Sequence, residues 1–148
     1  MAQEEQTGGT GVGHRTVSMT RLAKGSYAVT NVRGGTMTIG EGDPHNFTPV
    51  ELLLAAIGGC SATDVDYIVA KRAEPLALDV VTEGDKVRDD DGNHMSGLTV
   101  SFTVTFPDGP DGDRAREMLP RAVAMSHDRL CTVTRTVLLA TEVESRVD

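Results

Sequence analysis

Aromatic residues are scarce in this sequence. The 148 residues include two tyrosines, three phenylalanines and no tryptophan. So few rings argue against a base-stacking platform and against a carbohydrate-binding shelf, and we expect neither. Positive charge is also in short supply, since 14 Lys and Arg stand against 22 Asp and Glu, for a net charge of −8. Nucleic acids and anionic membranes both require a basic surface, so neither is expected as the main partner.

Long apolar runs and additional cysteines are lacking too. The longest apolar run, residues 52–59, is far shorter than the roughly 20 residues of a membrane span. Residues 1–14 are polar and rich in glycine, which predicts a flexible leader rather than a signal peptide, and we therefore expect a cytoplasmic protein. In a reducing compartment, two cysteines are expected to be free thiols or a transient catalytic pair rather than a structural disulfide.

The length predicts a single domain over residues 15–148. Strand-like runs occupy residues 16–22, 27–32 and 35–39, separated by glycine-containing turns. Thr48 and Pro49 then mark the start of a long helix, predicted from Val50 to about Arg72. Asp64 falls on the same side of this helix as its apolar positions, which are Leu53, Ala56, Ile57, Cys60, Tyr67 and Ile68.

The second half of the chain continues with two strands and more helix. Residues 76–87 and 98–106 are predicted strands, the latter alternating strictly between apolar and polar residues, and residues 89–93 form the turn between them. A helix is expected over residues 113–126, with Pro120 kinking it or ending its first part and Met118, Ala122 and Met125 facing inward. A short helix over 129–136 and a closing strand over 138–147 complete the prediction. Hairpin strands around a long helix indicate an α+β fold.

Two cysteine segments are the candidates for chemistry. Cys60 follows Gly58 and Gly59 in mid-helix, where two glycines are costly, so we expect a partner helix or a substrate to approach the backbone there. Cys131 follows His127 by four residues, which would place a base beside a thiol if the helix is continuous. From the residues alone, a packing role is the commoner interpretation for Cys60, and a surface or capping role is the commoner one for His127.

Metal motifs are absent from the local sequence. There is no Cys-x-x-Cys and no His-x-x-x-His, so a structural zinc site is not expected. The acidic run at residues 89–93 begins like a calcium loop, but position 94 is His and the twelfth position is Val100 rather than Glu. We interpret this run as a hairpin turn.

The sequence resembles the OsmC/Ohr family, the osmotically inducible and organic-hydroperoxide-resistance proteins. The resemblance is carried by FTPVELLLAAIGGC at 47–60, continuing SATDVDYIVAKRAEP, and by AMSHDRLCTV at 124–133, and it extends over about residues 15–147. It implies an intertwined α+β homodimer with active sites at the dimer interface. It further implies a thiol peroxidase with Cys60 as the peroxidatic and Cys131 as the resolving cysteine, which reduces organic hydroperoxides with a lipoyl-type dithiol and needs no cofactor or metal.

Charged residues around the thiol depart from the family pattern. In the hydroperoxide reductases a Glu follows the helix-opening Pro and pairs with an Arg over the reactive cysteine, whereas here that position is Val50 and Glu51 comes one residue later. The resemblance places the supporting arginine at Arg21, with Lys24 and Arg33 as rivals. We assign Cys60, Cys131, Arg21 and Glu51 as catalytic residues on this basis.

Two other functions remain open on the sequence. One is a non-catalytic OsmC-like module that binds an apolar ligand at the dimer interface, which the loss of the Glu at Val50 favours. The other is a Cys–His hydrolase that uses Cys131 and His127 and gives Cys60 no role. Retention of both cysteines favours the peroxidase. Thr132, where many relatives have Pro, is a further departure.

Overall fold

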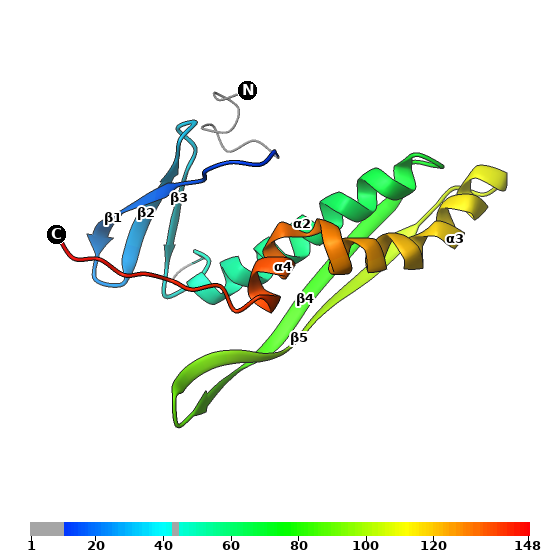
Figure 1. Cartoon of the computed structure of the whole chain (residues 1–148). Helices are drawn as coiled ribbons and strands as arrows, with labels where there is room; N and C mark the ends of the chain where they lie inside the picture. The colour runs from blue at the N-terminus through cyan, green and yellow to red at the C-terminus, as the bar shows by residue number, and fades with distance from the viewer. Residues whose placement is uncertain (1–10, 43–44) are drawn as a thin grey trace. The chain divides into compact units, whose positions relative to one another are not determined.

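A computed structural model describes residues 11–42 and 45–148 (Figure 1). The chain divides into two compact units, residues 1–52 and 53–148, each of which is described by itself. The prediction of a single domain over 15–148 therefore stays a prediction, and residues 1–10 of the predicted leader lie outside the described part. The elements run in the order β1 (Val17–Ala23), β2 (Ser26–Asn31), β3 (Thr36–Gly40), α2 (Pro49–Ala70), β4 (Ala77–Asp89), β5 (Gly92–Thr105), α3 (Pro110–Met125), η1 (Ser126–Leu130) and α4 (Thr132–Leu138).

The first unit contains an antiparallel sheet of order β1-β2-β3, which confirms the three predicted strands. Two tight turns connect them. Gly25 adopts a φ of 73°, a left-handed conformation that glycine allows at no steric cost, between β1 and β2. The Asn31 side chain accepts hydrogen bonds from the backbone N–H groups of Arg33 and Gly35, at 2.9 and 3.0 Å, and so closes the second turn.

Helix α2 begins with a reciprocal capping arrangement. The Glu51 carboxylate accepts a hydrogen bond from the Thr48 backbone N–H at 2.9 Å, and the Thr48 hydroxyl accepts one from the Glu51 N–H at 3.2 Å. Pro49 occupies the first turn, where its missing N–H costs nothing. The predicted start is thus confirmed, and the helix ends at Ala70, two residues before the predicted end.

The buried face of α2 differs from the predicted one. Tyr67, assigned to the apolar face, is 74% exposed, and Leu53 is exposed as well. Ile57 is buried as predicted, but from it the buried stripe follows the i, i+4 series through Ser61, Val65 and Val69. The prediction was wrong here because α2 is apolar on most of its circumference, so its periodicity does not single out one face.

Length and composition alone would also allow α2 to cross a membrane. Its buried residues, however, pack within the domain: Val65 and Val69 belong to the main core cluster with Phe106, Ala115 and Ala122. At Gly58, β4 approaches so closely that a Cβ atom would overlap the Thr82 hydroxyl. The close approach predicted from the glycine pair is confirmed at Gly58, although a strand makes it rather than a helix, while Gly59 has no neighbour within 4 Å.

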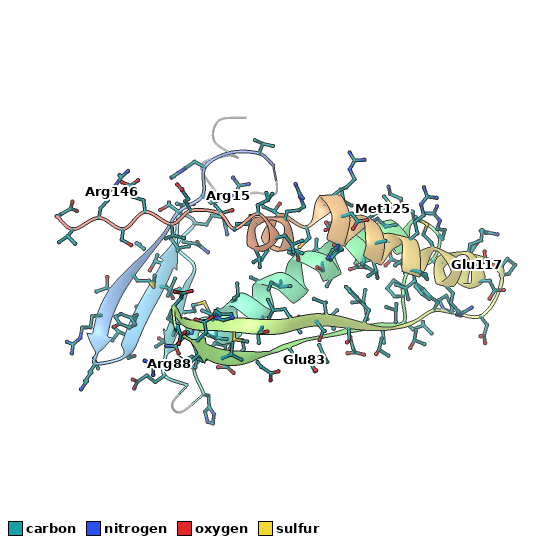
Figure 2. The ribbon with its side chains drawn as sticks, turned by 60° about the horizontal axis from the view of Figure 1, so that its bottom comes forward. Arg15, Glu83, Arg88, Glu117, Met125 and Arg146 are labelled. Atoms are coloured by element: carbon teal, nitrogen blue, oxygen red, sulfur yellow. The ribbon has the colours of Figure 1, made fainter. Side chains whose placement is uncertain are left out.

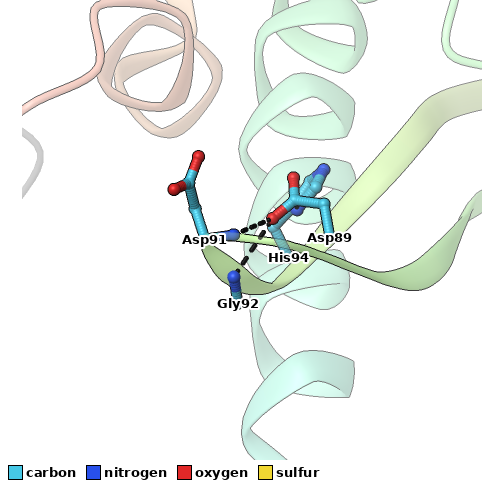
Figure 3. A network of polar contacts seen from close by, with 4 residues as sticks. All are labelled: Asp89, Asp91, Gly92 and His94. Carbon is cyan, nitrogen blue, oxygen red and sulfur yellow. Dashed lines mark hydrogen bonds and ion pairs between the residues drawn. The ribbon is translucent and has the colours of Figure 1, made fainter.

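Strands β4 and β5 form a long antiparallel hairpin with Asp89 opposite Gly92. One Asp89 carboxylate oxygen accepts hydrogen bonds from the N–H groups of Asp91 and Gly92 at 2.9 and 3.1 Å, and the other lies 3.5 Å from Nδ1 of His94 (Figure 3). This acidic run is therefore the predicted hairpin turn. Figure 2 shows the helices on one side of the hairpin and Glu83 on the other, in keeping with the predicted half-buried alternation.

Helix α3 begins at Pro110, before the predicted start at residue 113, and it continues through Pro120, which therefore does not end it. Met125 at its end is 37% exposed, so the prediction that it faces inward was wrong (Figure 2). The predicted short helix is present as the π-helical turn η1 followed by α4. The predicted strand over 138–147 is wrong, because α4 includes Leu138 and residues 141–148 pair with no strand in the described part of the chain.

Candidate functional site

Helix α2 presents Cys60 and Asp64 one turn apart on one side, because i and i+4 positions are neighbours on a helix surface. Ser61 turns toward the buried stripe beside them. Cys60 and Asp64 are half-buried and Ser61 is buried. One helical turn thus supplies a thiol, a carboxylate and a hydroxyl to the same neighbourhood.

Cys131 reaches this neighbourhood because the chain changes direction around it. The π-helical turn η1 ends at Leu130. Cys131 follows with an extended backbone and serves both as the C-cap of η1 and as the N-cap of α4. Its N–H donates to the Ser126 carbonyl at 2.9 Å. The Ser126 hydroxyl in turn donates to Asp64 Oδ2 at 2.9 Å, which fastens η1 to α2. Isolated π-helical turns are often found at functional sites.

The structure brings together two cysteines that lie 71 positions apart in the sequence. Both are free thiols, and the Sγ atoms of Cys60 and Cys131 and a carboxylate oxygen of Asp64 all lie within 4.8 Å of one another. A disulfide needs the sulfurs to approach to about 2.05 Å, so the two thiols would have to move closer together to bond.

The two thiols have opposite pKa shifts. Burial raises the pKa of Cys60, and the neighbouring Cys131 raises it further, against hydrogen bonds from the backbone of Val133 and Thr132. Burial also acts to raise the pKa of Cys131, but hydrogen bonds from Thr134 and Ser61 outweigh it, so that this pKa is lowered. Within a single chain Cys131 is therefore the more readily ionised of the pair.

The contacts of Cys131 account for this lowering. The Ser61 hydroxyl donates to its sulfur at 3.5 Å, and the Thr134 backbone N–H donates at 3.4 Å. The Thr134 hydroxyl oxygen lies 3.2 Å from the sulfur, so it can accept from the thiol and donate to the thiolate. The sequence analysis did not predict Ser61 or Thr134 as partners of Cys131. The signal that could have indicated Thr134 is its position three residues after an N-cap residue.

A cavity of about 210 Å³ adjoins the buried thiol, since Ser61 and Thr134 line it and both contact the Cys131 sulfur. His127 is its third polar lining residue. The remaining lining side chains are apolar and come from α2, β5, α3 and α4: Ile57, Leu98, Val100, Phe102, Val123, Val137 and Leu138. Such a cavity suits a small, mostly apolar molecule with one polar end.

The geometry of a Cys–His hydrolase is not formed in the described residues. His127 is an exposed residue whose Nδ1 lies 3.0 Å from the Asp128 carboxylate. The side-chain hydrogen-bond partners of the Cys131 sulfur are Ser61, Thr134 and Cys60. The thiol thus has hydroxyl, backbone and thiol partners in place of the imidazole base.

The two charged residues predicted for the site lie on different elements. The Glu51 carboxylate caps the start of α2, and hydrogen bonds with the Thr48 backbone and side chain lower the pKa of Glu51. Arg21 is exposed on β1, opposite Tyr27. Because Arg21 and Cys60 belong to separately described units, the catalytic assignment of Arg21, and equally that of Lys24 or Arg33, stays a prediction.

A long helix over antiparallel strands, with two thiols from distant segments beside an apolar cavity, defines an α+β two-cysteine domain. The family model for OsmC-like proteins matches residues 40–146. The chain belongs to this OsmC-like family.

Solved structures show the same fold. A hypothetical protein from Aquifex aeolicus is 22% identical with a TM-score of 0.70, and the match covers 88% of this chain and 91% of that one. An OsmC-like protein of unknown function from Vibrio cholerae is 14% identical (TM-score 0.69, 84% and 94% covered). An OsmC-like protein from Mycoplasma pneumoniae is 12% identical (TM-score 0.65, 84% and 87% covered). A comparison with curated proteins finds no match.

Proposed function

We propose that this protein is a cysteine-based peroxidase that reduces organic hydroperoxides. The observation that carries the proposal is the pair of free thiols, Cys60 and Cys131, with donor atoms within 4.8 Å of each other beside an apolar cavity. Membership of the OsmC-like family supports it, since the family includes hydroperoxide-resistance proteins. The apolar lining favours an organic hydroperoxide over hydrogen peroxide.

The proposed reaction has three steps. The Cys60 thiolate attacks a peroxide oxygen, the O–O bond breaks, and the alcohol leaves with a proton, which turns Cys60 into a sulfenic acid. The Cys131 thiolate then attacks the Cys60 sulfur, the S–O bond breaks, and the hydroxide takes up a proton and leaves as water, which forms the disulfide. An external dithiol of the lipoyl type reduces the disulfide to two thiols and is itself oxidised to a disulfide. The lowered pKa of Cys131 suits the second step, because the thiolate is the attacking species.

The first step requires positive charge near Cys60. Burial raises the pKa of this thiol, and no lysine or arginine is among the groups that shift it in the described part of the chain. We propose Arg21 as the source of that charge, contributed within a homodimer, with Glu51 as its acidic partner when the dimer assembles. A guanidinium close to the sulfur would favour the thiolate.

A homodimer is supported by apolar side chains that one chain leaves uncovered. Ile39 is the one buried hydrophobic residue among the strands of the β1–β3 sheet, whose exposed apolar residues include Val17, Met19, Leu22, Tyr27 and Met37. A sheet with so small a core needs a further apolar surface to be stable. Light scattering at low micromolar concentration should give twice the 15.7 kDa chain mass, and a monomer mass would contradict the proposal.

The decisive experiment follows consumption of cumene hydroperoxide and of hydrogen peroxide, with dihydrolipoamide or glutathione as reductant. We expect faster consumption of cumene hydroperoxide, turnover with the dithiol, and no turnover for Cys60→Ser. Cys131→Ser should complete one turnover and then stall, with over-oxidation at Cys60. Wild type given one equivalent of peroxide should lose both free thiols and yield one peptide pair that links Cys60 to Cys131.

Two results would overturn the proposal: no peroxide consumption by fully reduced wild type, or consumption unaffected by Cys60→Ser. For Arg21, the apparent pKa for alkylation of Cys60 should rise in Arg21→Ala. Arg33→Ala is the matched control, and a shift in Arg33→Ala alone would reassign the supporting role to Arg33.

A second candidate function is a binding module for an apolar ligand, which the mainly aliphatic lining of the cavity favours. In that case a ligand with an apolar body should bind equally well to wild type and to Cys60→Ser, and peroxide should not be consumed. For either function we propose a cytoplasmic location, where the two cysteines would be kept as the free thiols that the peroxidase reaction requires.

A further inference from the structure

The two sulfur atoms and the Asp64 carboxylate form a cluster of three potential metal ligands. Each offers one donor atom, and all three donors lie within 4.8 Å of one another. Around a tetrahedral zinc ion with Zn–S bonds of about 2.3 Å, neighbouring donors are about 3.5–3.8 Å apart. Side-chain movements of about 1 Å would therefore bring the three donors onto one ion.

The surroundings of the cluster fit a metal site. The Ser126 hydroxyl donates to Asp64 Oδ2 at 2.9 Å, which fixes the carboxylate and leaves its other oxygen available. Such hydrogen bonds to a ligand are typical of metal sites, where they orient the donor. Cys131 is fully buried, whereas Cys60 and Asp64 are partly exposed, so an ion could enter from their side. The rigid i, i+4 spacing on α2 holds two of the three ligands in place.

We propose that Cys60, Asp64 and Cys131 in their reduced state bind one thiophilic divalent cation, with Zn²⁺ as the best match. Two thiolates and one carboxylate exclude Mg²⁺ and Ca²⁺, which require oxygen ligands, and they leave a fourth tetrahedral position for water. Binding releases the two thiol protons and involves no change of oxidation state. A disulfide between the two cysteines removes both sulfur ligands, so oxidation and metal binding exclude each other.

This site does not depend on peroxidase activity, and its test does not use it. Tag-free, fully reduced protein is titrated with Zn²⁺ against a chromogenic chelator. We expect the reduced wild type to bind one Zn²⁺ per chain. After oxidation of wild type to the disulfide, binding should fall to the level of the double variant Cys60→Ser, Cys131→Ser. Reduced Asp64→Asn should bind Zn²⁺ at least about tenfold more weakly than wild type. Asp66→Asn is the matched control, since it makes the same change of charge at an exposed position two residues along α2 and should bind like wild type.

Cobalt substitution counts the sulfur ligands. Co²⁺ bound by thiolates gives a sulfur-to-cobalt charge-transfer absorption, which should fall to about half in Cys60→Ser or Cys131→Ser and be retained in Asp64→Asn at saturating Co²⁺. Circular dichroism establishes whether each variant is folded. If a cysteine variant does not fold, the Zn²⁺ affinity of Asp64→Asn still tests the proposal. Three results would each overturn the proposal. Reduced wild type could bind no more Zn²⁺ than the double variant, Asp64→Asn and Asp66→Asn could bind Zn²⁺ with equal affinity, or two chains could share one ion.

Discussion

Removal of the Ser61 hydroxyl should make Cys131 harder to ionise. Ser61 is buried and donates a hydrogen bond to the Cys131 sulfur at 3.5 Å. Among the causes that lower the pKa of Cys131, this bond ranks second, after the bond from the Thr134 hydroxyl and ahead of the bond from the Thr134 backbone N–H. In Ser61→Ala the thiolate loses one donor while Thr134 still contacts the sulfur, so the pKa of Cys131 should rise.

The size of the effect follows from the geometry. Hydrogen bonds to charged groups contribute roughly 1.5–3 kcal/mol, and a bond at the long end of the range should contribute less, about 1 kcal/mol. At a pH below the pKa of Cys131, a loss of about 1 kcal/mol lowers the thiolate fraction about fivefold. If this thiolate attacks the Cys60 sulfenic acid, disulfide formation should slow by a similar factor, less the gain in nucleophilicity that accompanies a higher pKa.

Ultraviolet absorbance of the thiolate measures ionisation without requiring a reagent to reach a buried sulfur. The titration is carried out in Cys60→Ser, where Cys131 is the one remaining cysteine, with the double cysteine variant as the blank for tyrosine. Thr63→Ala is the control, because Thr63 is exposed and its hydroxyl bonds to the Gly59 carbonyl rather than to a thiol. Superimposable titrations for Ser61→Ala and Thr63→Ala would refute the argument.

Two further predictions concern helix α2. Gly59→Ala should stabilise the chain by up to about 1 kcal/mol in thermal or chemical unfolding, because no neighbour lies within 4 Å of the added Cβ. Gly58→Ala should be less stable than Gly59→Ala by about 1–3 kcal/mol, because its Cβ meets Thr82, and equal stabilities of the two variants would contradict this packing. Glu51→Gln should keep the cap on Thr48 at neutral pH and Glu51→Ala should lose it. Because folding lowers the pKa of Glu51, its stabilising effect is present above its unfolded pKa and is lost as the pH falls through the folded one. Glu51→Gln should therefore be less acid-sensitive in unfolding experiments, and loss of peroxidase activity in a stable Glu51→Gln would support its proposed pairing with Arg21.

Elements with local signals were predictable from the sequence. The Thr48–Pro49 pair marks the start of α2, and the strict alternation from residue 98 marks β5 and its buried face. Both signals arise within a few residues of the feature that they specify. The hairpin turn at 89–92 belongs to the same class, because Asp89 bonds to the backbone two and three residues ahead.

Features that depend on distant partners were not predictable in this way. Leu138 and Leu139 suggested a strand because they are apolar, but α4 extends to Leu138 and Ala140 then takes a positive φ of 51°. Tyr67 fitted the helical period but is 74% exposed. Apolar character favours burial but does not specify which face of a largely apolar helix is covered, so periodicity alone could not place Tyr67.

The site illustrates the same division between local and distant information. The i, i+4 relation of Cys60 and Asp64 is visible in the sequence, whereas the position of Cys131 depends on η1, which Ser126 fastens to Asp64. Asp64 therefore acts on the sulfur pair through Ser126, because it holds the segment that carries Cys131. The charge of Cys131 raises the pKa of Cys60, so the site of a single chain favours one ionised cysteine at a time. Added positive charge, whether a guanidinium or a divalent cation, would relieve this restriction, which is why the peroxidase proposal requires an arginine and the metal proposal does not.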